Sequence, residues 1–175
     1  SDANPLSGNY NTGVGQGAGE DIRDGSSNTF IGYHAGRAIT SGATNTAVGA
    51  NAMDACSTGN SNVAVGQDAG AVLTTGSQNV FVGMDAGDTV TTGGQNIAIG
   101  CNANPGATTN TSIVIGHDIG GEGDNTAKIG GTSGAYNGAN SSSWSTTSDR
   151  RIKKNILDNN VGLDIINRIR IIKLS

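Results

Sequence analysis

Hydrophobic residues recur along the chain in short clusters that are separated by polar and glycine-rich segments. Each cluster has three residues, as in Val63-Ala64-Val65, and follows an asparagine. The first and third residues are mostly β-branched and lie on one face of a strand, whereas the middle residue lies on the other. A strand that is apolar on both faces is buried on both sides. The pattern therefore predicts short strands with two apolar faces. One face would fill the interior of its own coil, and the other would need a second surface to cover it.

The clusters belong to a 17-residue repeat that is marked by three ladders of identical residues. A fixed period of this length is typical of a solenoid, whose coils are buried against their neighbours. We expect the asparagines to hydrogen-bond between coils and the glycines to allow tight corners. The ladders are Gly8, Gly25, Gly42, Gly59, Gly76 and Gly93; Asn11, Asn28, Asn45, Asn62, Asn79 and Asn96; and Gly15, Gly32, Gly49, Gly66, Gly83 and Gly100.

These observations predict an all-β fold, a parallel β-roll over residues 8–130 with a lead-in at residues 1–7. A second, shorter strand is expected at the small residues Ala18, Ala35, Ala52, Ala69, Ala86 and Ala103. The period shortens to 16 at Gly116 and to 14 at Gly130, where the solenoid should end. Residues 131–147 are rich in Gly and Ser and are expected to form a linker. A short amphipathic helix with Asn159 or Asn160 as its N-cap is expected, because apolar residues from Val161 onward have helical spacing.

The composition indicates a slim rod that associates with itself. Only 3% of the residues are aromatic and 29 are glycine, so a conventional globular core is excluded. A slim monomer offers nothing to cover the second apolar face of its strands. We therefore predict self-association, most simply as a homotrimer.

The charge is distributed unevenly. Residues 1–148 carry 11 acidic and 3 basic side chains, whereas residues 149–175 carry 3 acidic and 7 basic ones. The acidic repeats argue against nucleic-acid binding, which needs a basic surface. No apolar run approaches the roughly 18 residues of a membrane span, so no membrane insertion is expected. No signal peptide is visible at Ser1.

Cys56 and Cys101 occupy different repeat positions, three coils apart. At about 4.8 Å per coil, roughly 14 Å separates them along the axis, which is too far for a disulfide. Two free thiols are expected, in agreement with synthesis in a reducing compartment such as a bacterial cytoplasm.

Asp68 and Asp85 are weak candidates for a metal site, because both follow the strand glycine at the same position, as does Asp118. Stacked in adjacent coils, the first two repel each other unless they spread apart or a cation bridges them. A solvated acidic face is the favoured interpretation. His34 and His117 occupy different repeat positions and are expected at the surface.

No cofactor is expected. Residues 13–18 match the Gly-x-Gly-x-x-Ala dinucleotide fingerprint, but the same stretch recurs as an ordinary coil and lacks the required strand and helix. An ice-binding face is disfavoured too, because the threonines lie in the Gly-rich connections rather than in a regular Thr-x-Thr strand array.

The pattern Asn-x-Ala-Val-Gly-x-x-Ala resembles the head domains of trimeric autotransporter adhesins, which are left-handed parallel β-rolls of three chains. It is still more similar to the repeats of bacteriophage tail fibres, as in residues 79–87. The resemblance covers residues 8–130 and implies a trimeric left-handed roll.

The tail separates these two families. Residues 148–156, Ser-Asp-Arg-Arg-Ile-Lys-Lys-Asn-Ile, resemble the start of the C-terminal intramolecular chaperone of endosialidase-type tailspikes, and residues 162–170 resemble its first helix. In that family the chaperone assists trimer folding and then cleaves itself off after a serine, which corresponds to Ser148. The catalytic lysine corresponds to Lys153, which would act as general base for the serine hydroxyl. Residues 148–175 cover only the beginning of such a domain.

The resemblance implies a structural and adhesive protein of the virion, a tail fibre or tailspike for host attachment that assembles in the host cytoplasm. The implied partners are two further copies of the chain, other virion tail proteins and a glycan or protein receptor on the host surface. The enzymatic activity it implies is a single-turnover Ser-Lys autoproteolysis, with no external substrate. The alternative is the head of a bacterial trimeric autotransporter adhesin.

Overall fold

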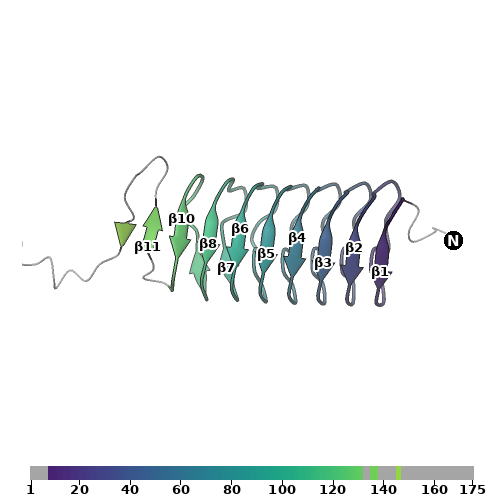
Figure 1. The fold of residues 1–175 in the computed structure, drawn as a ribbon, viewed down its shortest axis with the longest axis horizontal. Helices are drawn as coiled ribbons and strands as arrows, with labels where there is room; N and C mark the ends of the chain where they lie inside the picture. The colour runs from purple at the N-terminus through teal and green to yellow at the C-terminus, as the bar shows by residue number, and fades with distance from the viewer. Residues whose placement is uncertain (1–7, 132–134, 138–144, 147–175) are drawn as a thin grey trace, which may run out of the picture.

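The computed structural model describes residues 8–131, 135–137 and 145–146. This part of the chain is a parallel β-solenoid of about seven turns, with the predicted repeat of about 17 residues (Figure 1). Most of the expected linker lies outside the described residues, and so do the lead-in, the chaperone segment and the expected helix.

One long sheet forms a wall of the solenoid. Its strands follow one another along the rod, and the first eight are parallel, each paired in register with the same repeat position of its neighbour. They are β1 (Thr12–Val14), β2 (Thr29–Ile31), β3 (Thr46–Val48), β4 (Val63–Val65), β5 (Val80–Val82), β6 (Ile97–Ile99), β8 (Ile113–Ile115) and β10 (Ala127–Ile129). The strand positions predicted from the hydrophobic clusters are therefore confirmed.

The expected second strand forms only near the C-terminal end, as β7 (Ala103–Asn104) paired with β9 (Ile119–Gly120). At Ala35, Ala52, Ala69 and Ala86 the chain makes turns instead. In each of these coils the residues immediately before and after the alanine have positive φ, for example Asp68 at 55° and Gly70 at 59°. Extended strands need negative φ, so this backbone does not form a strand, although it still hydrogen-bonds between coils, as from the Gly70 N–H to the Ala86 carbonyl at 2.8 Å. At Asn104 and Gly120 the second positive-φ residue is missing, and a strand forms.

The asparagine ladder connects the coils inside the solenoid, as predicted. Asn62 accepts the Asn79 backbone N–H at 3.0 Å through Oδ1 and donates from Nδ2 to the Gly76 carbonyl at 2.9 Å. Asn28, Asn45, Asn79 and Asn96 repeat this arrangement and are all fully buried. Buried polar groups need such partners, so the ladder stabilises both the corner and the stacking. The glycine after each strand also fulfils its expected role, since a Cβ on Gly66 would lie 2.4 Å from the Gly83 oxygen.

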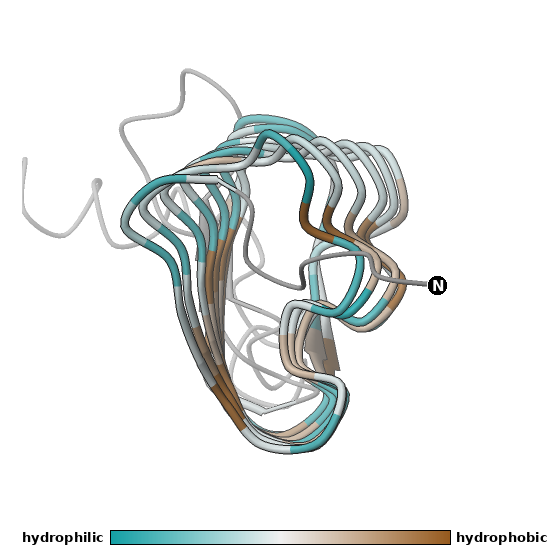
Figure 2. Ribbon diagram, turned by 90° about the vertical axis from the view of Figure 1, so that its right-hand side faces the viewer, coloured by the Kyte–Doolittle hydropathy of each residue, from teal (hydrophilic) through white to brown (hydrophobic). Residues whose placement is uncertain are grey.

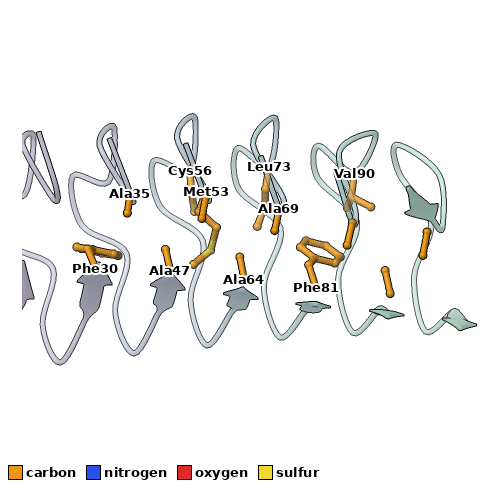
Figure 3. Close-up of a cluster of buried hydrophobic side chains, with 14 of the residues drawn as sticks. Phe30, Ala35, Ala47, Met53, Cys56, Ala64, Ala69, Leu73, Phe81 and Val90 are labelled. Carbon is orange, nitrogen blue, oxygen red and sulfur yellow. The ribbon is translucent and has the colours of Figure 1, made fainter. Parts of the chain in front are cut away.

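The interior is filled by the middle residues of β2 to β6 and β8 and by residues of the opposite wall (Figure 3). Phe30 and Phe81 are the large strand residues, whereas Ala47 and Ala64 lie between them. Met53 projects from the opposite wall into the space that these alanines leave (Figure 3). The large interior side chains thus alternate between the two walls, which keeps the narrow core close-packed.

The apolar interior ends at β10. Its middle residue is Lys128, which occupies the register of the buried Val114 and bonds Glu122 through Nζ at 2.6 Å. The sheet then continues with antiparallel pairing through β11 (Ala135–Asn137) and β12 (Ser145–Thr146). Within the described residues, the last parallel strand thus ends at Ile129, next to Gly130.

Candidate functional site

The outer face of the long sheet is the most distinctive surface of the described chain. The first and third residues of each strand point outward, because successive side chains alternate between faces. Ile31, Val65 and Ile99 are 42%, 37% and 38% exposed, whereas the middle residues of the same strands, Phe30, Ala64 and Ala98, are fully buried. The solenoid therefore covers one face of its strands and leaves the other partly open.

This outer face is a continuous stripe without charge. Its members are Thr12, Val14, Thr29, Ile31, Thr46, Val48, Val63, Val65, Val80, Val82, Ile97, Ile99, Ile113, Ile115, Ala127 and Ile129. Successive coils superimpose when the rod is viewed along its axis, so hydrophobic segments stack in register (Figure 2). At about 4.8 Å per strand, the eight strands extend the stripe over roughly 34 Å. Contiguous apolar surface on this scale marks an interaction site.

Two further exposed residues flank the stripe beyond the strand glycines. Tyr33 is 49% exposed and its ring stacks on His34, with 3.8 Å between the ring centroids. Met84 is 48% exposed at the same repeat position as Tyr33. These side chains widen the apolar surface at the corner of their coils.

The structure brings Asp68 and Asp85 into adjacent coils, as predicted. The Asp85 backbone N–H donates to the Gln67 carbonyl at 3.0 Å, next to Asp68. The Asp68 carboxylate accepts hydrogen bonds from Asn51 Nδ2 at 2.9 Å and from Gln67 Nε2 at 2.8 Å. One amide donor from the preceding coil and one from the adjacent residue therefore satisfy it. Across the described ranges, no three His, Cys, Asp or Glu side chains are grouped so that they could hold a metal ion.

The aspartates belong to a polar ladder that the sequence reasoning missed. Its six members have φ between 52° and 56° and occupy one repeat position: His34, Asn51, Asp68, Asp85, Asn102 and Asp118. Asn and Asp tolerate this left-handed conformation better than other non-glycine residues. The recurrence of short polar residues two positions after the strand glycine was the available signal.

Both cysteines are free, as predicted. Cys56 is fully buried at the repeat position of Ile39, Leu73 and Val90. Burial raises the pKa of its thiol to about 11, although a backbone hydrogen bond with Gly59 acts in the opposite direction. A protonated, inaccessible thiol is unreactive, so Cys56 is a small core residue rather than a nucleophile.

The two predicted cleavage residues, Ser148 and Lys153, lie outside the described residues. None of the described elements is a helix long and apolar enough to cross a bilayer.

Comparisons with protein-family models, with curated proteins and with solved structures found no match to this chain. Its function has to be inferred from its own residues. The outer stripe is the feature that carries such an inference.

Proposed function

We propose that this chain is a structural and adhesive segment of a bacteriophage tail fibre or tailspike, and that it works as a homotrimer presenting a stable rod for host attachment. The observation that carries the proposal is the uncharged, largely β-branched outer stripe, which the solenoid leaves partly exposed along its length. Three copies packed around a common axis would bury this stripe. The acidic remainder of the rod would face solvent and the host surface.

The phage assignment rests on the sequence of the tail. The segment beginning at Ser148 resembles the start of a self-cleaving chaperone, and this is the feature that favours a phage fibre over an autotransporter head. In the proposed maturation, the chaperone aligns three chains, and Lys153 then assists Ser148 in cutting the chain after Ser148. The left-handed winding, the C-terminal helix and the virion and receptor partners follow from the same resemblance.

There is a physical reason for a removable chaperone on such a rod. The strand contacts join residues 17 positions apart, and the repeats are similar enough to pair in several registers. Non-local pairing is slow, and repeated sequences misalign easily. A removable chaperone domain that aligns three chains axially would shorten the search for the correct register.

Two measurements on the purified protein test the proposal. Light scattering of the 175-residue chain should give three times its 17.4 kDa mass, and a monomer at micromolar concentration would overturn the trimer. The denatured intact mass of the full open reading frame should show a break after Ser148 that disappears in Ser148→Ala. If both proteins remain unbroken, the self-cleaving chaperone is rejected, and the trimer depends on the stripe alone.

A further inference from the structure

The outer stripe changes its chemistry along the rod. The third strand residue is apolar in every coil, but the first is Thr12, Thr29 and Thr46 in β1 to β3. In β4, β5, β6 and β8 the first residue is Val or Ile, beginning with Val63, and in β10 it is Ala127. The stripe is thus one apolar residue wide in its first three coils and two residues wide in the coils of β4, β5, β6 and β8. We call the outward residues of β4, β5, β6 and β8 the seam.

In an interface between copies, the threonine-containing coils of β1 to β3 and the seam are not interchangeable, because they favour different partners. Burying a Val or Ile side chain is favourable in proportion to the apolar area that is removed from water. A threonine hydroxyl that is buried without a hydrogen-bond partner is unfavourable. Threonines at the same level of neighbouring chains can bond each other, as in cross-strand Thr pairs, whereas a threonine opposite a valine cannot. The change between Thr46 and Val63 therefore marks one level of the rod.

Such a mark is needed because the repeat is otherwise degenerate. Sliding one copy by a coil moves it only about 4.8 Å and brings the next glycine and asparagine into equivalent positions. An axial shift also prevents three chains from closing around an axis, so it would leave an open assembly. A chemical boundary that penalises the shift is a known device for fixing register.

We propose that copies of this chain associate in parallel and in register through the seam, and that the boundary between Thr46 and Val63 fixes their register. The inference rests on the proposed trimer for its occupant, a second and third copy of the same chain. It adds the place, direction and alignment of their contact.

Charge and size both favour another copy as the occupant. The seam holds no charged residue, whereas residues 1–148 carry 11 acidic against 3 basic side chains, so copies would repel each other over much of the remaining surface. Two outward residues on each of eight strands make sixteen. The seam supplies eight of these sixteen, and the whole stripe with Tyr33 and Met84 approaches the roughly 20–30 residues per side of a stable interface, so the seam is the more apolar half of a contact that the threonine coils extend. The partner stripe also has the same spacing and length.

Disulfide trapping tests the register at the resolution of one coil. The full chain is first made cysteine-free with Cys56→Val and Cys101→Ala, which insert the residues found at the equivalent positions Val90 and Ala50. Val65→Cys and Ile99→Cys are then introduced separately and oxidised. Bridged Cα atoms usually lie about 5.5–6 Å apart and at most about 6.8 Å, so an axial offset of about 4.8 Å moves a pair at the usual separation beyond the limit and disfavours bridging.

A mixed experiment detects slippage directly. Chains with Val65→Cys are co-expressed with mass-tagged chains carrying Val82→Cys, which lies one coil further. In-register association predicts covalent dimers of each single variant, and an excess of at least tenfold of same-residue dimers over mixed dimers. Light scattering before oxidation establishes whether trimers are present.

The outcomes separate this inference from the function on which it rests. If trimers form but give abundant mixed 65–82 dimers, the in-register contact through the seam is rejected and the trimer stands. The same conclusion follows if trimers form and neither Val65→Cys nor Ile99→Cys gives a cross-link. Cross-links restricted to Val65→Cys, without any at Ile99→Cys, contradict an in-register contact along the whole seam. A monomer overturns both proposals.

Discussion

Phe81 and Gly87 share a single space inside the coil of β5. A Cβ on Gly87 would lie 2.4 Å from Cδ1 of the Phe81 ring. Two coils earlier the same repeat positions hold Ala47 and Met53, so the large side chain comes from the opposite wall. Each of these two coils accommodates one large interior residue at this pair of positions, and either wall can provide it.

Gly87→Ala should therefore destabilise the solenoid. The added methyl group would overlap the Phe81 ring, and φ at this position is 68°, which alanine adopts reluctantly. Overpacking and backbone strain together should cost about 2–4 kcal/mol. Chemical denaturation would measure the loss. Gly123→Ala is the control, because its φ is also positive, at 109°, while nothing lies within 4 Å of the new methyl group; an equal loss in both variants would contradict the packing argument.

The shared space also predicts coupling between the two positions. Phe81→Ala alone should leave a cavity and cost about 3–5 kcal/mol. Combined with Gly87→Met, it recreates the pair formed by Ala47 and Met53, and Met53 already adopts a φ of 52°. The double variant should be more stable than the sum of the single losses by at least about 1 kcal/mol. Additive losses in this double-mutant cycle would reject the complementarity.

The asparagine ladder provides a second test. In Asn62→Ala, the Gly76 carbonyl and the side-chain amide of Asn79 lose buried hydrogen bonds. Each group left unpaired should cost about 1–3 kcal/mol, so the thermal midpoint should fall by several degrees or more. Asn60→Ala is the matched control, since Asn60 Oδ1 bonds the Ala43 N–H at an exposed position. Similar thermal midpoints for the two variants would show that burial of the asparagine ladder does not determine how much it contributes to stability.

Much of the fold could be predicted from the sequence because its determinants repeat. Asn62 and Gly66 appear with the same spacing in every complete coil, and Val63-Ala64-Val65 alternates across the strand between them. A strict repeat fixes which positions stack, and alternation fixes which residues share a face. The strands, their parallel register and the partly open face follow from these two facts.

The second wall could not be predicted in the same way. Ala69 is small and buried, as expected, but its neighbours Asp68 and Gly70 both have positive φ. The hydrophobic pattern of this wall does not reveal the sign of φ, and a short polar residue occurs both in strands and in left-handed turns. The candidate cleavage pair is a different case, because its basis is a sequence resemblance and both residues lie outside the described ranges.

Cys56 should make stability depend on pH at alkaline values. The pKa of its thiol rises from a usual 9.0 to about 11 because burial disfavours the thiolate. Between these values the unfolded chain releases the proton and the folded chain retains it, so stability should decrease as pH rises from 9 to 11. The loss should be at most about 2–3 kcal/mol. Cys56→Val should lack this part of the pH dependence in chemical denaturation, and identical curves for both proteins would contradict it.

Asp85→Asn should stabilise the protein slightly. Asp68 already has amide donors from Asn51 and Gln67, and Asp85 places a second carboxylate in the next coil. Removing one of two stacked like charges should contribute about 0.2–1 kcal/mol, less at high salt because of screening. Thermal unfolding at low and high ionic strength measures this effect. If the substitution instead lowers the midpoint, and chelation lowers that of the parent protein equally, a bridging cation is indicated.

The seam leads to a prediction about assembly. Val82→Thr keeps the shape and β-propensity of the outer residue but adds a hydroxyl in the two-residue-wide part of the stripe. Three copies would bury three such hydroxyls around the axis, and the trimer should dissociate at concentrations at least tenfold higher. Val14→Thr makes the same change in β1, where Thr12 already narrows the apolar stripe, so dissociation should change much less. Light scattering over a dilution series measures both midpoints. If both substitutions weaken the trimer equally, the contact between chains is distributed evenly along the rod. A contact concentrated in the seam would be weakened mainly by Val82→Thr.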